Sequence, residues 1–154
     1  MPLARETEMT REETDAFLGE NETGVLSLAE DDDPYAAPVS YGYDPEKRAF
    51  YFRLVSTPES QKRRFLKAST TARFVVYGDE ASGPEETYRS VVAAGTLREI
   101  DPAELSVDQI EQYGDAKRPL FEIWGEPKEN LDIRLYEFAT TNVTGRRTEV
   151  ERDA

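Results

Sequence analysis

The sequence contains no cysteine and no histidine among its 154 residues. Without cysteine there are no disulfides, thiolate nucleophiles or iron–sulfur clusters. Without histidine the usual general base and the usual protein ligand of zinc and haem iron are missing. These two absences exclude most classes of metalloenzyme and hydrolase, and we predict no metal site.

Long apolar segments are also absent. No run of about 18 apolar residues occurs, so no membrane-spanning segment is expected. The first nine residues, MPLARETEM, lack the apolar core of a signal peptide. We therefore expect a cytoplasmic protein that has no membrane partner.

The composition is that of one acidic globular domain. The mass of 17.5 kDa fits a single domain over residues 1–154, with a core at about 10–147. Hydrophobic residues make up 38% and aromatic residues 10%, which is enough for a core. The net charge of −13 comes from 32 acidic and 19 basic residues. Such a surface suits a halophilic protein, because high salt screens the self-repulsion; a surface made for a basic partner is the alternative.

Hydrophobic patterning and turn residues predict mainly β structure. Thr10 and Glu13 have the spacing of a capping box, which predicts a helix that ends near Asn21. A second helix is expected to start at Ser56–Glu59 and run to about residue 69. A helical stretch is expected over 101–130. Strands are expected over 24–29, 35–43, 48–55, 72–77, 87–100 and 131–143, with a loop at 78–84.

The connections between these strands indicate the fold class. Most are short hairpins, so the sequence predicts a mainly β (α+β) fold, an antiparallel barrel with short helical insertions. Pro38 inside a strand indicates an edge or a bulge, because proline cannot donate to the ladder. Gly95 indicates a bulge or a close backbone approach.

Positive charge is concentrated in one segment. Residues 47–78 contain eight basic residues and one acidic residue, a net charge of +7, whereas the other 122 residues carry 11 basic and 31 acidic residues, or −20. The segment includes an expected helix N-terminus, where unpaired N–H groups favour an anion. Arg53, Ser60 and Lys62 could together hold a phosphate there. The alternatives are a solvated helix and a nucleic-acid surface, but the overall charge opposes nucleic-acid binding.

The order and spacing of several short segments resemble a known family. The chain is similar to the pyridoxamine 5'-phosphate oxidase-like family of FMN-binding split β-barrels over about residues 10 to 147. The segments that carry the resemblance are 24–28 (GVLSL), 34–41 (PYAAPVSY), 49–53 (AFYFR), 60–62 (SQK), 72–76 (ARFVV), 88–95 (YRSVVAAG) and 143–147 (VTGRR).

The resemblance implies a fold, a cofactor and a set of site residues. It implies a dimeric split barrel that binds FMN in a groove formed by both subunits. Pro38, Val39, Ser40 and Tyr41 would lie along the flavin ring, Arg53, Ser60 and Lys62 would hold the phosphate, Gln61 falls where the family often has arginine, and Ser90 would meet the flavin from a later strand. The chain ends without the family's histidine-containing signature, which argues against vitamin B6 oxidase activity. A deazaflavin is the alternative cofactor.

Other residues have two interpretations each. Trp124 is expected to pack a helix or fill an interface, or else to stack on the flavin. Tyr41, Tyr51 and Tyr88 are expected to pack rather than donate protons. Arg146 and Arg147 could reach a cofactor phosphate or end a strand. Glu104, Asp108 and Glu111 would share a helix face by chance rather than as a metal site.

Two hypotheses of function follow from the resemblance and the residues. The first is an FMN-dependent oxidoreductase of unknown substrate, in which the flavin supplies the chemistry and no residue is assigned as catalytic. The second is a non-catalytic flavin- or deazaflavin-binding protein, a carrier or sensor.

Overall fold

The computed structural model describes residues 4–56, 61–68, 71–82, 85–107, 109 and 132–151, and a single antiparallel sheet dominates it. The strands are β1 (Ala4–Glu8), β2 (Thr23–Glu30), β3 (Asp33–Asp44), β4 (Ala49–Ser56), β5 (Thr71–Ser82), β6 (Glu85–Ile100) and β7 (Asp132–Glu151). They lie in the order β1-β7-β4-β3-β2-β5-β6, and β6 also pairs with β7. Strands β2 to β7 therefore close into a barrel, which confirms the predicted mainly β antiparallel fold.

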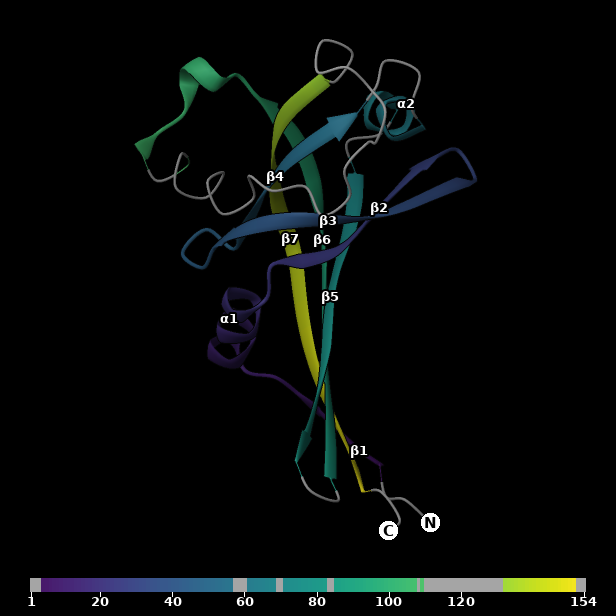
Figure 1. Ribbon diagram of the computed structural model, residues 1–154, viewed down its shortest axis with the longest axis vertical. Helices are drawn as coiled ribbons and strands as arrows, with labels where there is room; N and C mark the ends of the chain where they lie inside the picture. Colours follow the sequence, from purple (N-terminus) through teal and green to yellow (C-terminus); the bar gives the residue numbers. More distant parts are fainter. Residues whose placement is uncertain are drawn as a thin grey trace.

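The ends of β5, β6 and β7 extend together beyond the barrel and form a three-stranded arm. Strand β6 pairs with β5 as far as Ser82↔Glu85 and with β7 as far as Glu85↔Glu151. Figure 1 shows the arm at the bottom of the view, with β1 beside the far half of β7. The loop predicted at 78–84 is wrong for residues 78–82, because cross-strand pairing with 85–89 keeps them extended. The last strand likewise continues past 143 to Glu151.

The pairing of β1 extends the sheet past the expected core. Its register runs from Ala4↔Val150 to Glu8↔Arg146. On the outward side, Arg146 Nη1 lies 3.1 Å from the carboxylate of Glu6. The first strand thus joins the sheet through a partner at the opposite end of the sequence.

Helix α1 (Arg11–Glu20) starts as predicted and packs on the inner side of the arm. The Thr10 hydroxyl accepts a hydrogen bond from the Glu13 N–H (3.1 Å), and the Glu13 carboxylate accepts one from the Thr10 N–H (3.4 Å). A Cβ at Gly145 on β7 would lie 2.6 Å from the Thr14 hydroxyl, so only glycine allows this close approach. Within the described ranges, neither this helix nor α2 (Gln61–Ala68) is long and apolar enough to cross a membrane.

The barrel interior is largely aromatic. Phe50, Phe52, Phe74 and Phe138 are at most 1% exposed, and the Phe52 and Phe74 ring centroids lie 4.9 Å apart. These side chains come from β4, β5 and β7, which alternate between inward and outward residues. The predicted irregularity at Gly95 is confirmed as a register shift between β6 and β7. A Cβ at Gly95 would lie 2.1 Å from the Ala139 carbonyl oxygen.

Candidate cofactor site

The barrel wall opens between β3 and β4. These strands pair only from Asp44↔Ala49 to Tyr41↔Phe52. Beyond that point residues 33–40 of β3 pair with β2, and residues 53–56 of β4 pair with β7. The described pairings therefore leave a split in the wall, with residue 40 on one side and residue 53 on the other.

Backbone groups of β3 are directed into this split. The Tyr41 N–H donates to the Glu22 carbonyl oxygen (3.0 Å), on the β2 side. Since successive residues of a strand direct their backbone groups to opposite sides, those of Ser40 and Pro38 point toward the split. Proline lacks an N–H, so Pro38 interrupts no ladder hydrogen bond there. The predicted edge position of Pro38 is confirmed.

Side chains beside the split separate into an inner and an outer set. Val39 and Tyr41 are 6% and 3% exposed and belong to the barrel core, so they can meet a ligand in the split only through backbone groups. Pro38 is exposed and Ser40 is half-buried on the outer face. Arg53 is half-buried on that same face, because its neighbours Phe52 and Leu54 point inward. Ser40 and Arg53 thus lie on the outer face, one on each side of the split.

The Tyr41 side chain has a structural role, because it links the barrel core to the end of α1. Its hydroxyl donates to the Leu18 carbonyl oxygen at the end of α1 (2.6 Å), and burial raises its pKa well above the ordinary value. Tyr51 is 1% exposed on the other face of β4, where burial first and the Glu137 carboxylate second raise its pKa to about 12. Both tyrosines pack as predicted, and both hold their protons at neutral pH.

The structure describes only some of the side chains in the basic segment. Arg64 on α2 contacts the carboxylates of Glu30 (3.2 Å) and Asp33 (3.0 Å), and its guanidinium lies 4.6 Å from the Phe65 ring centroid. Gln61 and Lys62 form the first turn of α2, but their side chains lie outside the described residues, and so does all of Ser60. The expected phosphate contacts of these three residues stay predictions.

Ser90 lies away from the split. It sits half-buried on the outer face of β6, between Tyr77 of β5 and Arg146 of β7. From Ser40 the path along the sheet crosses β2 and β5, about 14 Å at the usual strand spacing. One chain therefore does not bring Ser40 and Ser90 into direct contact.

Comparison with known proteins defines the family. The family model for pyridoxamine 5'-phosphate oxidase matches residues 10–147. The chain belongs to this family. A comparison with curated protein sequences found no match.

Solved structures similar to this family member agree with the fold. A FAD-binding protein of Mesorhizobium loti is 20% identical, with a TM-score of 0.70, over 96% of this chain and 98% of that one. A candidate 5-nitroimidazole antibiotic resistance protein of Bacteroides thetaiotaomicron is 13% identical, with a TM-score of 0.67, over 99% and 93%. The FAD binding protein of Mycobacterium smegmatis is 17% identical, with a TM-score of 0.58, over 96% and 100%.

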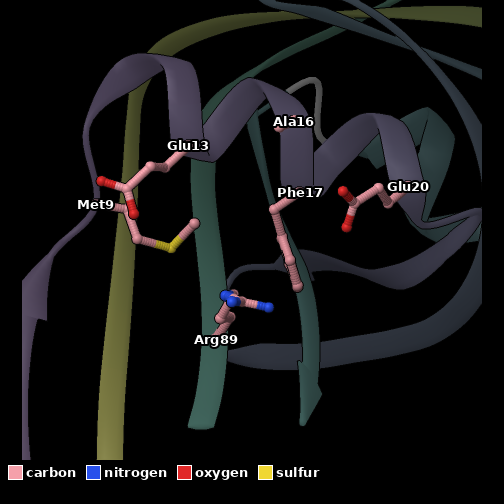
Figure 2. Close-up of a pocket in the computed structure, with 6 residues that line it drawn as sticks. All are labelled: Met9, Glu13, Ala16, Phe17, Glu20 and Arg89. Atoms are coloured by element: carbon pink, nitrogen blue, oxygen red, sulfur yellow. The ribbon is translucent and has the colours of Figure 1, made fainter. Parts of the chain in front are cut away.

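A cavity of about 380 Å³ lies between α1 and the arm of this pyridoxamine 5'-phosphate oxidase family member. Figure 2 shows Glu13, Phe17 and Glu20 of α1 above Arg89 of β6, with Met9 at one end. Glu13 also accepts a hydrogen bond from Arg147 Nη1 (2.8 Å). The two glutamates are balanced by Arg89 and Arg147, so this cavity offers no excess of positive charge for a phosphate.

The C-terminal arginines have structural partners in this family member. Arg147 contacts Glu13 on the inner face, and Arg146 contacts Glu6 on the outer face. The interpretation that they end a strand is wrong, because β7 continues to Glu151 through its pairing with β6.

Two further predictions concern the segment after β6. In the part of the chain that the structure describes, no group of three potential metal ligands occurs. Glu104 lies in a short 3₁₀ turn, Pro102–Glu104, whereas Asp108, Glu111 and Trp124 lie outside the described residues.

Sequence reasoning missed Tyr77 and misjudged Tyr88. Their side chains are 69% and 43% exposed and line a second cavity, of about 450 Å³, together with Ser90 and Thr148 on the outer face of the arm. Tyr88 was expected to be a half-buried packing residue. Alternation within the predicted strand 72–77 already places Tyr77 on the outer face with Arg73 and Val75, and this signal could have found it.

Proposed function

We propose that this protein is an FMN-dependent oxidoreductase that binds the flavin at the split between β3 and β4. The observation that carries the proposal is the arrangement of Ser40 and Arg53 on the outer margins of an opening into which the backbone of residues 38–40 is directed. Backbone groups at such an opening can hydrogen-bond the edge of a flat ring. The bound flavin would supply the redox chemistry, and the protein would orient it.

The residues present fit a phosphorylated flavin. Arg53 offers a forked guanidinium, which suits a phosphate, and α2 begins five residues after the end of β4, at Gln61. The first turn of α2 carries Lys62 and leaves backbone N–H groups for an anion. Relatives of known structure are described as FAD-binding proteins, which supports a flavin as the ligand class.

We further propose a homodimer, because the outer face carries an apolar stripe. Pro38, Val25, Val75 and Val92 lie opposite one another on four adjoining strands, and all four are at least partly exposed. A second copy would cover this stripe and bring its Ser90 toward the flavin of the first. Light scattering in high salt should give about twice the monomer mass of 17.5 kDa, and a monomer at every concentration would refute the dimer.

Titration of apo variants with FMN and with riboflavin tests the phosphate anchor. A charge-assisted hydrogen bond contributes about 1.5–3 kcal/mol, so Lys62→Ala and Arg53→Ala should each weaken FMN roughly 10- to 150-fold. Riboflavin, which has no phosphate, should be affected much less. Arg53→Lys should also weaken FMN, because an ammonium lacks the forked geometry.

Arg64→Ala is the matched control for these variants. It removes a positive charge from the same segment, but that charge is already paired with Glu30 and Asp33. FMN affinity should therefore stay close to that of the wild type. Equal losses of FMN and riboflavin, or equal effects of all the variants, would contradict the anchor.

Turnover separates the oxidoreductase from a carrier or sensor. The FMN-loaded protein should be reduced by NADH or NADPH and reoxidised by an added acceptor, with the flavin absorbance as the readout. A deazaflavin and FAD, offered in competition with FMN, test the choice of cofactor. Tight binding without reduction would favour the non-catalytic alternative.

A further inference from the structure

The outer face of the arm presents two tyrosines beside a candidate flavin contact. In the β5–β6 register, Tyr77 lies opposite Ser90 and Asp79 lies opposite Tyr88. Opposed residues share a face, and so do residues two apart on one strand. All four side chains therefore lie on the outer face, and diagonal neighbours such as Tyr77 and Tyr88 are about 7–8 Å apart. Together they line the arm cavity of about 450 Å³.

The rings of Tyr77 and Tyr88 are more exposed than most large hydrophobic side chains among the described residues. Among the described residues the exposed large hydrophobic side chains are Tyr77, Tyr88 and Val107, and two of the three belong to this one cavity. A cavity of this volume, lined by aromatic rings and a few polar groups, is of the size that holds a small molecule. Aromatic side chains stack with flat rings in offset or edge-to-face arrangements.

The charged groups around the cavity indicate which ligands it can bind. Asp79 is exposed on the same face. The Tyr88 hydroxyl donates to the Glu86 carboxylate (2.6 Å), so a second carboxylate lies beside the cavity. The faces of tyrosine rings carry negative potential, which favours cations. Arg89 also lines the cavity, but its side chain points to the inner face, where Figure 2 shows it beneath α1. The carboxylates of Asp79 and Glu86 at the outer face therefore disfavour an anionic ligand, and the net charge of −13 adds to this effect.

We propose that the arm cavity is the subsite for the flavin's reaction partner, and that this partner is a planar aromatic compound without negative charge. Its ring lies between Tyr77 and Tyr88, and the Ser90 hydroxyl hydrogen-bonds it. This inference rests on the proposed flavin function, because Ser90 is also the residue expected to approach the flavin. The phosphate of the cofactor and the ring of the substrate would thus be bound by regions of opposite charge.

Three ring compounds of equal size test the proposal. The probes are benzamide, benzamidine and benzoate, which are neutral, cationic and anionic. Their binding to the FMN-loaded protein is followed by saturation-transfer NMR. Benzamide and benzamidine should bind, and benzoate several-fold more weakly. Asp79→Asn should reduce the preference for benzamidine over benzoate.

Variants at Tyr77 test how much its aromatic ring contributes to probe binding. Loss of an aromatic contact in Tyr77→Leu should weaken benzamide and benzamidine about 3- to 10-fold. Tyr77→Phe, which keeps the ring, and Val107→Ala, which alters an exposed apolar residue outside β5 and β6, should leave probe binding unchanged. Tyr77 is 69% exposed, so these variants should fold, and circular dichroism checks that they do.

FMN titrations of the same variants separate this inference from the proposed function. Unchanged FMN affinity in Tyr77→Leu, with weakened probes, supports a substrate subsite. A parallel loss of FMN would show that the cavity seats the flavin ring and would overturn the proposal. Binding of benzoate as tight as that of benzamidine, or no probe binding to FMN-loaded protein, would overturn it as well. Probe binding by a wild-type protein that fails to bind FMN would refute the flavin function and with it the subsite's role.

Discussion

Tyr41→Phe removes one oxygen atom from the contact between α1 and the barrel. The Tyr41 hydroxyl is buried and donates to the Leu18 carbonyl oxygen at 2.6 Å. Leu18 is in the last turn of α1, where the carbonyls have no partner within the helix. The neighbouring Phe17 carbonyl is bonded by the Asn21 side-chain amide (2.8 Å). The variant therefore leaves one carbonyl of the helix end without its donor.

The expected cost follows from that unsatisfied acceptor. A buried acceptor that loses its partner costs about 1–3 kcal/mol. For a domain of this size, about 2 kcal/mol corresponds to a fall of about 4–8 °C in Tm. The phenyl ring keeps its edge-to-face contacts with Phe50 and Phe74, so no packing loss adds to this value.

Thermal and urea unfolding measure the effect, and Tyr35→Phe is the control. Tyr35 stacks on Phe65 (5.1 Å between centroids), and no hydrogen bond of its hydroxyl is seen among the described residues. Its variant should lose little stability. FMN affinity of folded Tyr41→Phe should equal that of the wild type, because this side chain points into the core. Unchanged stability, or a large loss of FMN affinity in the folded variant, would refute the inward role of Tyr41.

Three further predictions follow. Gly95→Ala should lower the free energy of unfolding in urea by about 1–3 kcal/mol, because its Cβ would lie 2.1 Å from the Ala139 carbonyl oxygen. Gly19→Ala in α1 is the control: its Cβ would meet no atom within 4 Å, so this variant should be neutral or stabilising. Burial raises the pKa of Tyr43 and Tyr51 from 10.0 to about 12, with added effects of Asp15 on Tyr43 and Glu137 on Tyr51. The unfolded chain therefore loses these two protons at lower pH than the folded protein does, and the free energy of unfolding should fall as pH rises from 10 to about 12. The fall should be less steep in Tyr43→Phe and in Tyr51→Phe. Tm should rise between about 0.1 M and a few molar salt, since screening relieves the repulsion of a chain with a net charge of −13, and a melt insensitive to salt would contradict this.

The sequence predicted those helices and bulges whose formation depends on residues close together in the chain. The capping box of Thr10 and Glu13 fixes the start of α1 within one turn. Gly95 marked its bulge because only glycine tolerates the approach of β7. Strand β1 gave no such signal: its residues are mostly charged and polar, and its place depends on β7, with pairs such as Glu6 and Arg146 that are 140 residues apart.

The candidate site was predictable in part for a similar reason. Charge and family resemblance pointed to Arg53 and to residues 38–41. Alternation in β3 implies that Val39 and Tyr41 share one face and Pro38 and Ser40 the other, but which face is the core depends on the closure of the barrel. The cavity at Tyr77 was missed because the strand was expected to end at this residue. Its extension comes from the pairing of residues 79–82 with β6, which a local pattern does not contain.

The position of β7 in the sheet has a consequence for synthesis on the ribosome. Strands β4-β3-β2-β5-β6 can pair before β7 emerges, but as an open sheet with β4 and β6 at its edges. Exposed edges invite pairing with other chains, and distant pairings form slowly. The nascent protein must therefore remain an unclosed sheet until its last strand is translated, and chains that stop before residue 132 would be the ones to aggregate.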